Sequence, residues 1–89
     1  MTKRVAVLGE QLCLMLPELV YEFLGRGSLF SYQTYGTGSA KVEVSNDLQN
    51  WITLFEVLGT DSIVLMHPWK YQRVVEVDNL KVHVLQGRH

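Results

Sequence analysis

The feature that most constrains the fold of this chain is the strict alternation of apolar and polar residues in short runs. Residues 40–45 (Ala-Lys-Val-Glu-Val-Ser) alternate in this way, and so do residues 80–84 (Leu-Lys-Val-His-Val). Successive side chains of a β-strand point to opposite faces, so a period of two predicts strands with one buried face. Because turn residues separate such runs about every eight to twelve positions, the pattern predicts a small antiparallel sandwich or barrel.

Turn residues divide the chain into about eight predicted strands and leave no dependable helix. Residues 18–24 are ambiguous, since they fit both a two-turn helix and a strand; we favour the strand because so short a helix is marginal. We expect a single all-β domain over residues 1–89, a small antiparallel β-sandwich for which a jelly roll is one option. The other predicted strands cover residues 3–8, 11–16, 28–35, 39–45, 51–57, 62–66, 69–77 and 80–85.

Three segments carry specific local predictions. Residues 11–16 are almost continuously apolar, which predicts a strand buried on both faces with Cys13 as an inert thiol. A lone cysteine cannot form an internal disulfide, so we expect folding in a reducing compartment. The glycines of residues 36–38 predict a flexible turn, and residues 78–79 (Asp-Asn) predict a tight hairpin before the last strand.

The chain is small for the number of large side chains that it carries. Its 89 residues include two tryptophans, four tyrosines and three phenylalanines. A domain of this size buries only about 60–65% of the surface of its unfolded chain. We therefore expect some aromatic side chains to reach the surface and to be covered by copies of the chain or by another protein.

Charge argues against nucleic acid and membrane partners. Eight basic and nine acidic residues give a net charge of −1, and no basic stripe is present that could neutralise phosphates. The apolar tract of residues 5–24 is interrupted by Glu10, Pro17, Glu18 and Glu22, so we expect neither a membrane span nor a signal peptide.

No pattern in the sequence predicts catalysis, a cofactor or a metal. His67, His83 and His89 lack the paired spacing of zinc ligands. We expect His83 on the solvent-facing side of the last strand, and His67 in a turn or at a surface contact. No glycine-rich phosphate loop and no nucleophile elbow is present, so we expect a protein that is not an enzyme.

Two segments stand out as candidates for function. Residues 45–51 (Ser-Asn-Asp-Leu-Gln-Asn-Trp) predict a turn braced by its own Asn and Asp side chains, with Trp51 packed into the core. Trp69, Tyr71 and Arg73 fall on one face of a predicted strand. Aromatic residues with arginine are the composition of an interface hot spot, although arginine packed over tyrosine within a sandwich gives the same pattern.

Together these segments resemble small bacteriophage virion proteins with a β-sandwich fold. Such proteins carry a Ser-x-Asp-Gly-x-x-Trp turn after an alternating strand, then a Tyr-x-Arg-Val strand and a short last strand that ends near a basic residue. The resemblance covers residues 38–88: the strand of residues 38–45, the turn that ends at Trp51, residues 70–74 (Lys-Tyr-Gln-Arg-Val), residues 80–85 and Arg88. Leu48 departs from the pattern, because it stands at the glycine position.

The resemblance implies a virion component made in the bacterial cytoplasm: a capsid decoration or cement protein that binds the major capsid protein, or a head-fibre or tail accessory piece. Such proteins are commonly homo-oligomers, and a trimer is favoured. The expected protein-interface residues are Trp69, Tyr71, Arg73, Tyr32 and Tyr35. The alternative is a carbohydrate-binding module in which Tyr32, Tyr35 or Trp69 stacks on sugar rings, since carbohydrate-binding sandwiches of the discoidin type share the same turn.

Overall fold

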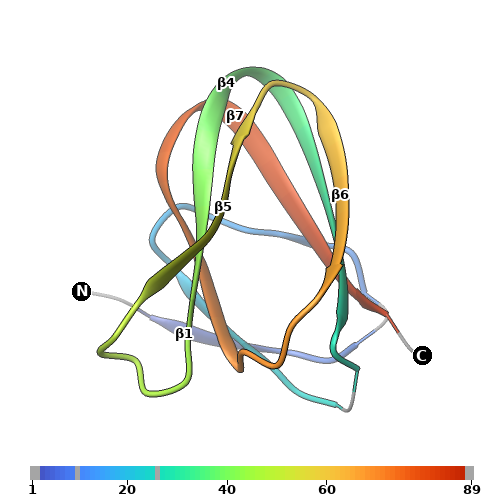
Figure 1. Ribbon diagram of the computed structural model, residues 1–89, viewed down its shortest axis with the longest axis vertical. Coiled ribbons are helices and arrows are strands. Elements are labelled where there is room, and N and C mark those ends of the chain that lie inside the picture. Colours follow the sequence, from blue (N-terminus) through green and yellow to red (C-terminus); the bar gives the residue numbers. More distant parts are fainter. Residues whose placement is uncertain (1–2, 10, 26, 88–89) are drawn as a thin grey trace.

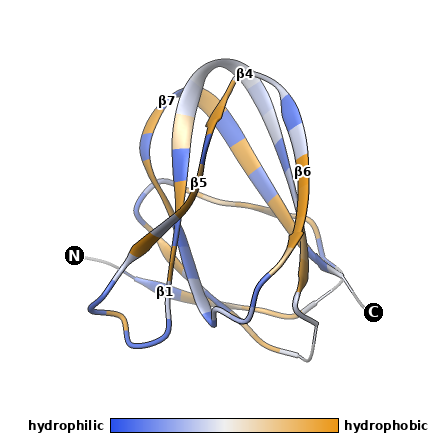
Figure 2. Ribbon diagram, in the orientation of Figure 1, coloured by the Kyte–Doolittle hydropathy of each residue, from blue (hydrophilic) through white to orange (hydrophobic). Residues whose placement is uncertain are grey.

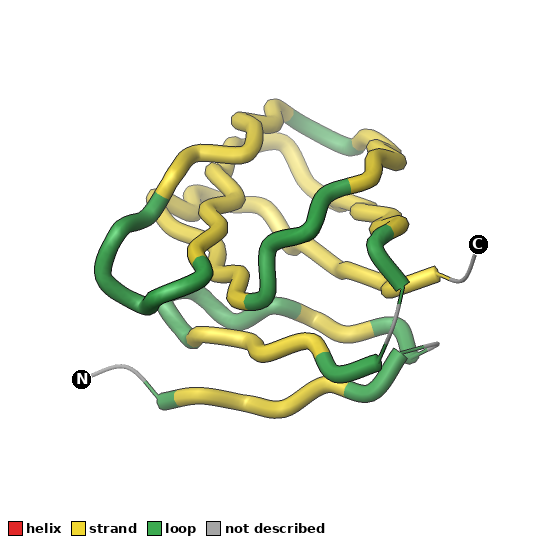
Figure 3. The backbone as a smooth tube through the Cα atoms, turned by 60° about the horizontal axis from the view of Figure 1, so that its bottom comes forward, coloured by secondary structure: helices red, strands yellow, loops and turns green. Residues whose placement is uncertain are grey.

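Seven β-strands form one mixed sheet in the computed structural model, which describes residues 3–9, 11–25 and 27–87 (Figures 1 and 3). The sheet order is β1-β3-β7-β4-β5, with β2 paired to β7 and β6 paired to β4. Over the described residues the fold is all-β, as the alternation predicts, and no helix there could cross a membrane. The strands are β1 (Arg4–Val7), β2 (Cys13–Leu14), β3 (Val20–Phe23), β4 (Leu29–Ser45), β5 (Ile52–Leu58), β6 (Asp61–Met66) and β7 (Tyr71–Gly87).

The long strands β4 and β7 run antiparallel over almost their whole length and arch at a common level (Figure 1). The bend divides the sheet into two arms. The first arm holds β5, residues 39–45 of β4 and residues 71–78 of β7; the second holds β6, residues 29–36 of β4 and residues 80–87 of β7. Consecutive strands β5 and β6 follow β4 around the same bend, so three lines of backbone arch together (Figure 1).

Close packing of backbones at the bend explains its glycines. A Cβ atom on Gly38 would lie 1.6 Å from the carbonyl oxygen of Asp78, and Gly36 has a φ of +140°. Only glycine fits such an approach and such a backbone angle. Residues 36–38 and 78–79 therefore continue their strands through the bend, and the predicted flexible turn and tight hairpin at these positions are wrong.

The core lies between the two arms. Tyr32 of the second arm packs its ring against Phe55 of the first arm, with ring centroids 4.9 Å apart. The alternating residues of the long strands supply most of the rest, which agrees with the period-two pattern. The buried apolar residues on these strands are Phe30, Tyr32, Ala40, Val42, Val44, Tyr71, Val74, Leu80, Val82 and Val84.

The N-terminal strands cover the free edge of β7. β3 pairs antiparallel with the first arm of β7, and β2 pairs with the second arm. The strand interpretation of residues 18–24 is confirmed, since Val20–Phe23 form β3. β1 pairs with β3 in parallel, so the expectation of a wholly antiparallel sheet is wrong at this position.

Residues 11–16 do not form the doubly buried strand that their composition predicts. Only Cys13 and Leu14 are in a strand, and this strand lies at an edge of the sheet. Met15 is buried while Leu14 and Leu16 are exposed, so the segment has one apolar face toward the core and one toward solvent. Cys13 is half-buried, and burial raises the pKa of its thiol, which makes it a poor nucleophile at neutral pH.

Candidate functional site

The two segments that stand out in the sequence meet in the folded chain. The guanidinium of Arg73 lies over the ring of Trp51, with Cζ 4.0 Å from the ring centroid. This distance is that of a close cation–π stack. Arg73 is on β7, and Trp51 ends the turn that connects β4 to β5, so the contact joins the turn to the sheet.

Ser45 and Asp47 organise the turn that holds Trp51. The hydroxyl oxygen of Ser45 accepts hydrogen bonds from the amides of Asp47 and Leu48, at 3.2 and 3.0 Å. The carboxylate of Asp47 accepts from the amides of Gln49 and Asn50, at 2.9 and 2.8 Å, and these hydrogen bonds hold the pKa of Asp47 well below its usual range. The predicted bracing is confirmed for Asp47, whereas the side chain of Asn46 accepts from the amide of Lys70, outside the turn, at 3.0 Å.

Leu48 adopts a backbone conformation that glycine reaches more easily than leucine. Its φ is +65°, in the left-handed region where a side chain costs about 1–2 kcal/mol. Leucine at this position therefore bears a steric cost that glycine would not bear. Leu48 and Trp51 line the same hollow.

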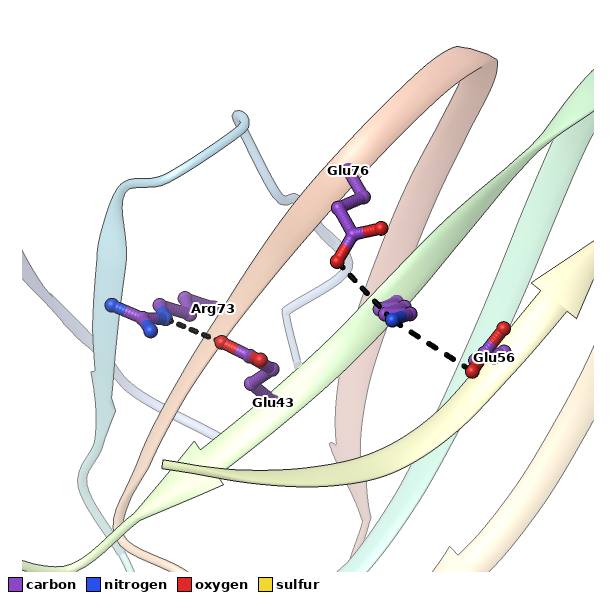
Figure 4. A network of polar contacts seen from close by, with 5 residues as sticks. Glu43, Glu56, Arg73 and Glu76 are labelled. Atoms are coloured by element: carbon purple, nitrogen blue, oxygen red, sulfur yellow. Dashed lines mark hydrogen bonds and ion pairs between the residues drawn. The ribbon is translucent and has the colours of Figure 1, made fainter. Parts of the chain in front are cut away.

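Glu43 fixes the guanidinium of Arg73 from the adjacent strand β4. The Nε of Arg73 donates to Oε1 of Glu43 at 2.8 Å, and both side chains are half-buried. In Figure 4 the terminal nitrogens of Arg73 point away from Glu43. Nearby, Lys41 lies between Glu56 at 3.8 Å and Glu76 at 3.2 Å, but these two carboxylates are mostly exposed (Figure 4). Arg73 is therefore held by a carboxylate on one side and by an aromatic ring on another.

A hollow of about 270 Å³ opens beside this stack and is lined by Arg4, Val20, Leu48, Trp51 and Arg73. A second arginine is therefore present at the rim. Arg4 lies 3.9 Å from Glu22 and 5.7 Å from the ring centroid of Tyr71, so it contacts β3 and β7 as well. The hollow combines guanidinium groups with apolar walls. This composition is typical of protein–protein interfaces. We call these five residues the arginine hollow.

The expected interface residues are dispersed. Tyr71 is buried beneath Arg4 and Lys70, and only Tyr71 and Arg73 share a strand face, because Trp69 precedes β7 in a loop. Trp51 is half-buried under Arg73 and does not fill the core as predicted, and the arginine stacks on Trp51 and not on a tyrosine.

Tyr32 is wrongly expected at an interface or under a sugar ring, since it is 0% exposed. Tyr35 is 49% exposed and packs edge-on against His83, which is half-buried and not on an open solvent-facing side. Of the three tyrosines named as interface residues, only Tyr35 is at the surface.

Tyr32 belongs to a buried polar network that the sequence does not predict. Its hydroxyl donates to Oε1 of Gln72 and lies 2.9 Å from Nε2 of His67. The Nδ1 of His67 accepts from the amide of Trp69, so the ring proton is on Nε2, which donates to Tyr32. Burial lowers the pKa of His67 to about 4, and its ring stacks on Phe30 with centroids 4.2 Å apart. His67 lies in the connection directly after β6, as expected for a turn position, but its ring is buried and neutral, so the alternative of a surface contact is wrong.

A second hollow, of about 370 Å³, lies over this network. Trp69 and His67 line it together with Phe23, Gly25, Gly27, Ser28, Phe30, Pro68, Lys70 and Gln86. Trp69 is half-buried there, so part of its ring is accessible. Trp69 and Arg73, which the sequence places on one strand face, therefore line two different hollows.

The described residues contain no group of three or more His, Cys, Asp or Glu side chains that could hold a metal ion. His89 and Arg88, named in the sequence analysis, lie outside the described residues. Comparisons with family models, with curated proteins and with solved structures found no match to this chain. The case for function therefore rests on the geometry of the two hollows and of the sheet edges.

The contact between Arg73 and Trp51 is the main feature that sequence reasoning missed. Period-two counting from Tyr71 places Arg73 on the outer face correctly, but the turn before β5 is distant along the chain. The contact could have been predicted from the turn itself. A turn that is braced by Ser45 and Asp47 and ends in a tryptophan places the aromatic ring against the neighbouring strands.

Proposed function

We propose that this protein is a non-enzymatic structural component of a bacteriophage virion, a capsid decoration or cement protein that binds the major capsid protein. The observation that carries the proposal is the stack of Arg73 on Trp51 beside the arginine hollow. Arginine and tryptophan are enriched among the residues that dominate binding energy at interfaces. The turn and strand of the phage resemblance supply both residues.

The rigidity of this cluster supports docking without rearrangement. Trp51 is held by a turn with several internal hydrogen bonds, and Arg73 is held by Glu43. Side chains that are ordered before binding lose less conformational entropy when a partner covers them. The proposed site is therefore preorganised, which is what a small protein that must attach to a shell requires.

Quantitative mass spectrometry of purified particles of the encoding phage tests the proposal. The protein should be present in a fixed ratio to the major capsid protein. Its absence from the particles would refute the proposal. A head-fibre or tail location would instead give a low copy number with the protein at one site in electron micrographs.

An add-back experiment tests the role of the arginine hollow. Purified protein is added to particles that lack it, as the wild type, as Arg73→Ala, as Arg73→Lys and as Lys81→Ala. We expect Arg73→Ala to weaken attachment about tenfold or more, as a hot-spot residue does. Arg73→Lys should also weaken it, because lysine keeps the charge but loses the planar stack. Lys81 is exposed on the second arm of β7, so Lys81→Ala should attach like the wild type. Equal attachment of all four proteins would exclude the hollow as the docking site.

The hollow around Trp69 favours a second candidate, carbohydrate binding. The half-buried Trp69 lines this hollow together with Ser28 and Gln86, a combination that offers stacking and hydrogen bonding to a sugar ring. In a Trp51→Phe background Trp69 is the remaining tryptophan, so its fluorescence reports on this hollow alone. A shift on addition of a polysaccharide found on a glycan array would support the candidate, and an array without hits would exclude it.

A further inference from the structure

The strand β6 forms an open edge of the sheet. It pairs with β4 on one side, and no other strand among the described residues pairs with it. Figure 1 shows β6 at the margin of the second arm. The backbone groups on the free side of an edge strand can pair with a strand from another molecule.

Three backbone amides fix which groups face outward. The amides of Gly59, Asp61 and His67 all donate toward β4, to Gly38 O at 2.8 Å, Thr34 Oγ1 at 2.9 Å and Ser28 O at 2.9 Å. Hydrogen-bonding directions alternate along a strand. The odd-numbered residues therefore bond inward, and the N–H and C=O groups of Ser62, Val64 and Met66 point to the open side.

The open side of β6 lacks the features that normally keep edges apart. Val64 is 60% exposed and Met66 is 61% exposed. The end of β6 nearest Met66 is strongly hydrophobic (Figure 2). Natural edge strands carry lysine, proline or inward-pointing charges that block pairing, whereas residues 62–66 (Ser-Ile-Val-Leu-Met) contain none of these.

We propose that β6 pairs antiparallel with β6 of a second copy of this chain, around a two-fold axis at Val64. The outward-pointing residues Ser62, Val64 and Met66 are symmetric about Val64, so Val64 faces Val64 of the second copy and Ser62 faces Met66. The outward groups of Val64 and Met66 then gain partners, and the amide of Ser62, which donates to Oδ1 of Asp61 at 2.7 Å in the single chain, exchanges this bond for the carbonyl of Met66 in the second copy, so that the two sheets become one. The exposed side chains of Val64 and Met66 are covered in the same step.

The charge and the boundaries of the segment single out a second copy as the occupant. Its one charged residue, Asp61, falls opposite His67 of the second copy, so no like charges oppose each other. A net charge of −1 adds little repulsion between copies. Residues 59–60 bend the chain just before β6, and Pro68, just after it, lacks an amide proton, so the length of the pairing is limited at both ends. This dimer is independent of the arginine hollow.

Sedimentation velocity over a concentration series tests the pairing. We expect a concentration-dependent dimer of the wild-type protein and a monomer for Val64→Pro, which removes an outward amide proton that β4 does not use. Val64→Lys serves as a second variant with an intact backbone, and circular dichroism shows that each variant folds. Leu14→Lys is the matched control, because Leu14 is exposed on the opposite edge strand β2 and should leave the dimer unchanged. A wild-type monomer at every concentration, or a dimer that Leu14→Lys disrupts and Val64→Lys does not, would overturn the proposal.

Cysteine trapping tests the register. In a Cys13→Ser background, Val64→Cys places two sulfur-bearing residues directly opposite each other, with Cα atoms about 5.5 Å apart, a separation that a disulfide spans. Ser62→Cys is the control, because each copy of residue 62 lies about 13 Å along the strand from the other, at about 3.3 Å per residue. Mild oxidation should yield covalent dimers of the Val64→Cys protein in preference to the Ser62→Cys protein. Equal yields would exclude the proposed axis.

Discussion

Gln72 and Arg73 are neighbours in β7, but their side chains belong to two different polar clusters, one buried and one at the surface. Gln72 points into the core, where it meets Tyr32 and His67. Arg73 points outward, where it meets Trp51 and Glu43. Both clusters combine an aromatic ring with polar partners, and both join strands that are distant in the sequence.

The two clusters differ in whether water can reach a polar group that loses its hydrogen-bond partner. In the inner cluster the loss of one partner leaves another polar group buried without a hydrogen bond, which is costly. In the outer cluster solvent reaches the freed groups, so the loss costs less stability. The inner cluster is therefore built to specify the fold, while the outer cluster is free to serve a partner.

Tyr32→Phe should produce the largest effect. The change leaves Oε1 of Gln72 and the Nε2 proton of His67 unpaired in the core, at about 1–3 kcal/mol for each group. We expect the free energy of unfolding to fall by about 3 kcal/mol in urea titrations. Tyr35→Phe is the control, since Tyr35 is exposed and bonds only to Gln33, and it should cost less than about 0.5 kcal/mol. Equal losses for the two variants would show that the buried hydrogen bonds of Tyr32 contribute no more to stability than the exposed hydrogen bond of Tyr35.

Arg73→Ala should cost about 1 kcal/mol of stability, because the partly exposed ion pair and stack are weakened by solvent. The same variant should lose attachment to a partner, as described above. A double-mutant cycle with Glu43→Gln measures the coupling between Arg73 and Glu43 by urea titration. A stability loss as large as that of Tyr32→Phe would show that the outer cluster is structural.

Acid should weaken the inner cluster selectively. The pKa of His67 is lowered to about 4 in the folded chain, whereas an unfolded histidine has a pKa of about 6.5. Between these values the unfolded chain binds the proton more readily, so stability falls as the pH drops from about 6.5 to about 4. We expect a loss of about 1 kcal/mol by pH 5, since water in the adjacent hollow moderates the effect. His67→Gln should flatten this pH dependence, and His83→Gln should leave it in place.

Leu48→Gly should have the smallest effect and the opposite sign. Glycine adopts a φ of +65° without the steric cost that leucine bears, so we expect a gain of about 0.5–1 kcal/mol in urea titrations. The gain is offset in part by the lost contact of Leu48 with the arginine hollow. Asn79 also has a positive φ, but asparagine tolerates it, so Asn79→Gly should change stability less. A loss of stability in Leu48→Gly would mean that the leucine side chain matters more than the strain.

The alternation of residues 40–45 and 80–84 was enough to predict an all-β fold, because it depends only on which face of a strand is buried. The bend was not predictable in the same way. Glycine marks both turns and close backbone contacts, and residues 36–38 use it for contact. Tyr32 and Tyr35 are three residues apart in β4, so alternation places them on opposite faces, but which face is covered by the other arm depends on the bend and on the strand order.

The candidate site was predictable in its parts and not in its assembly. The bracing of residues 45–51 follows from local side-chain chemistry, which the sequence displays directly. The pairing of Trp51 with Arg73 depends on which strands become neighbours, and strand order has no local signature. The role of His67 depends in the same way on Tyr32 and Gln72 arriving from other strands.

The continuity of β4 and β7 through both arms has a consequence for how the molecule comes apart. The two arms share both long strands and pack their inner faces on one core, where Tyr32 of one arm contacts Phe55 of the other, so melting one arm would expose the core face of the other. Amide exchange in the centres of these two strands should therefore proceed only through whole-molecule opening, with a single protection level on both sides of Gly36.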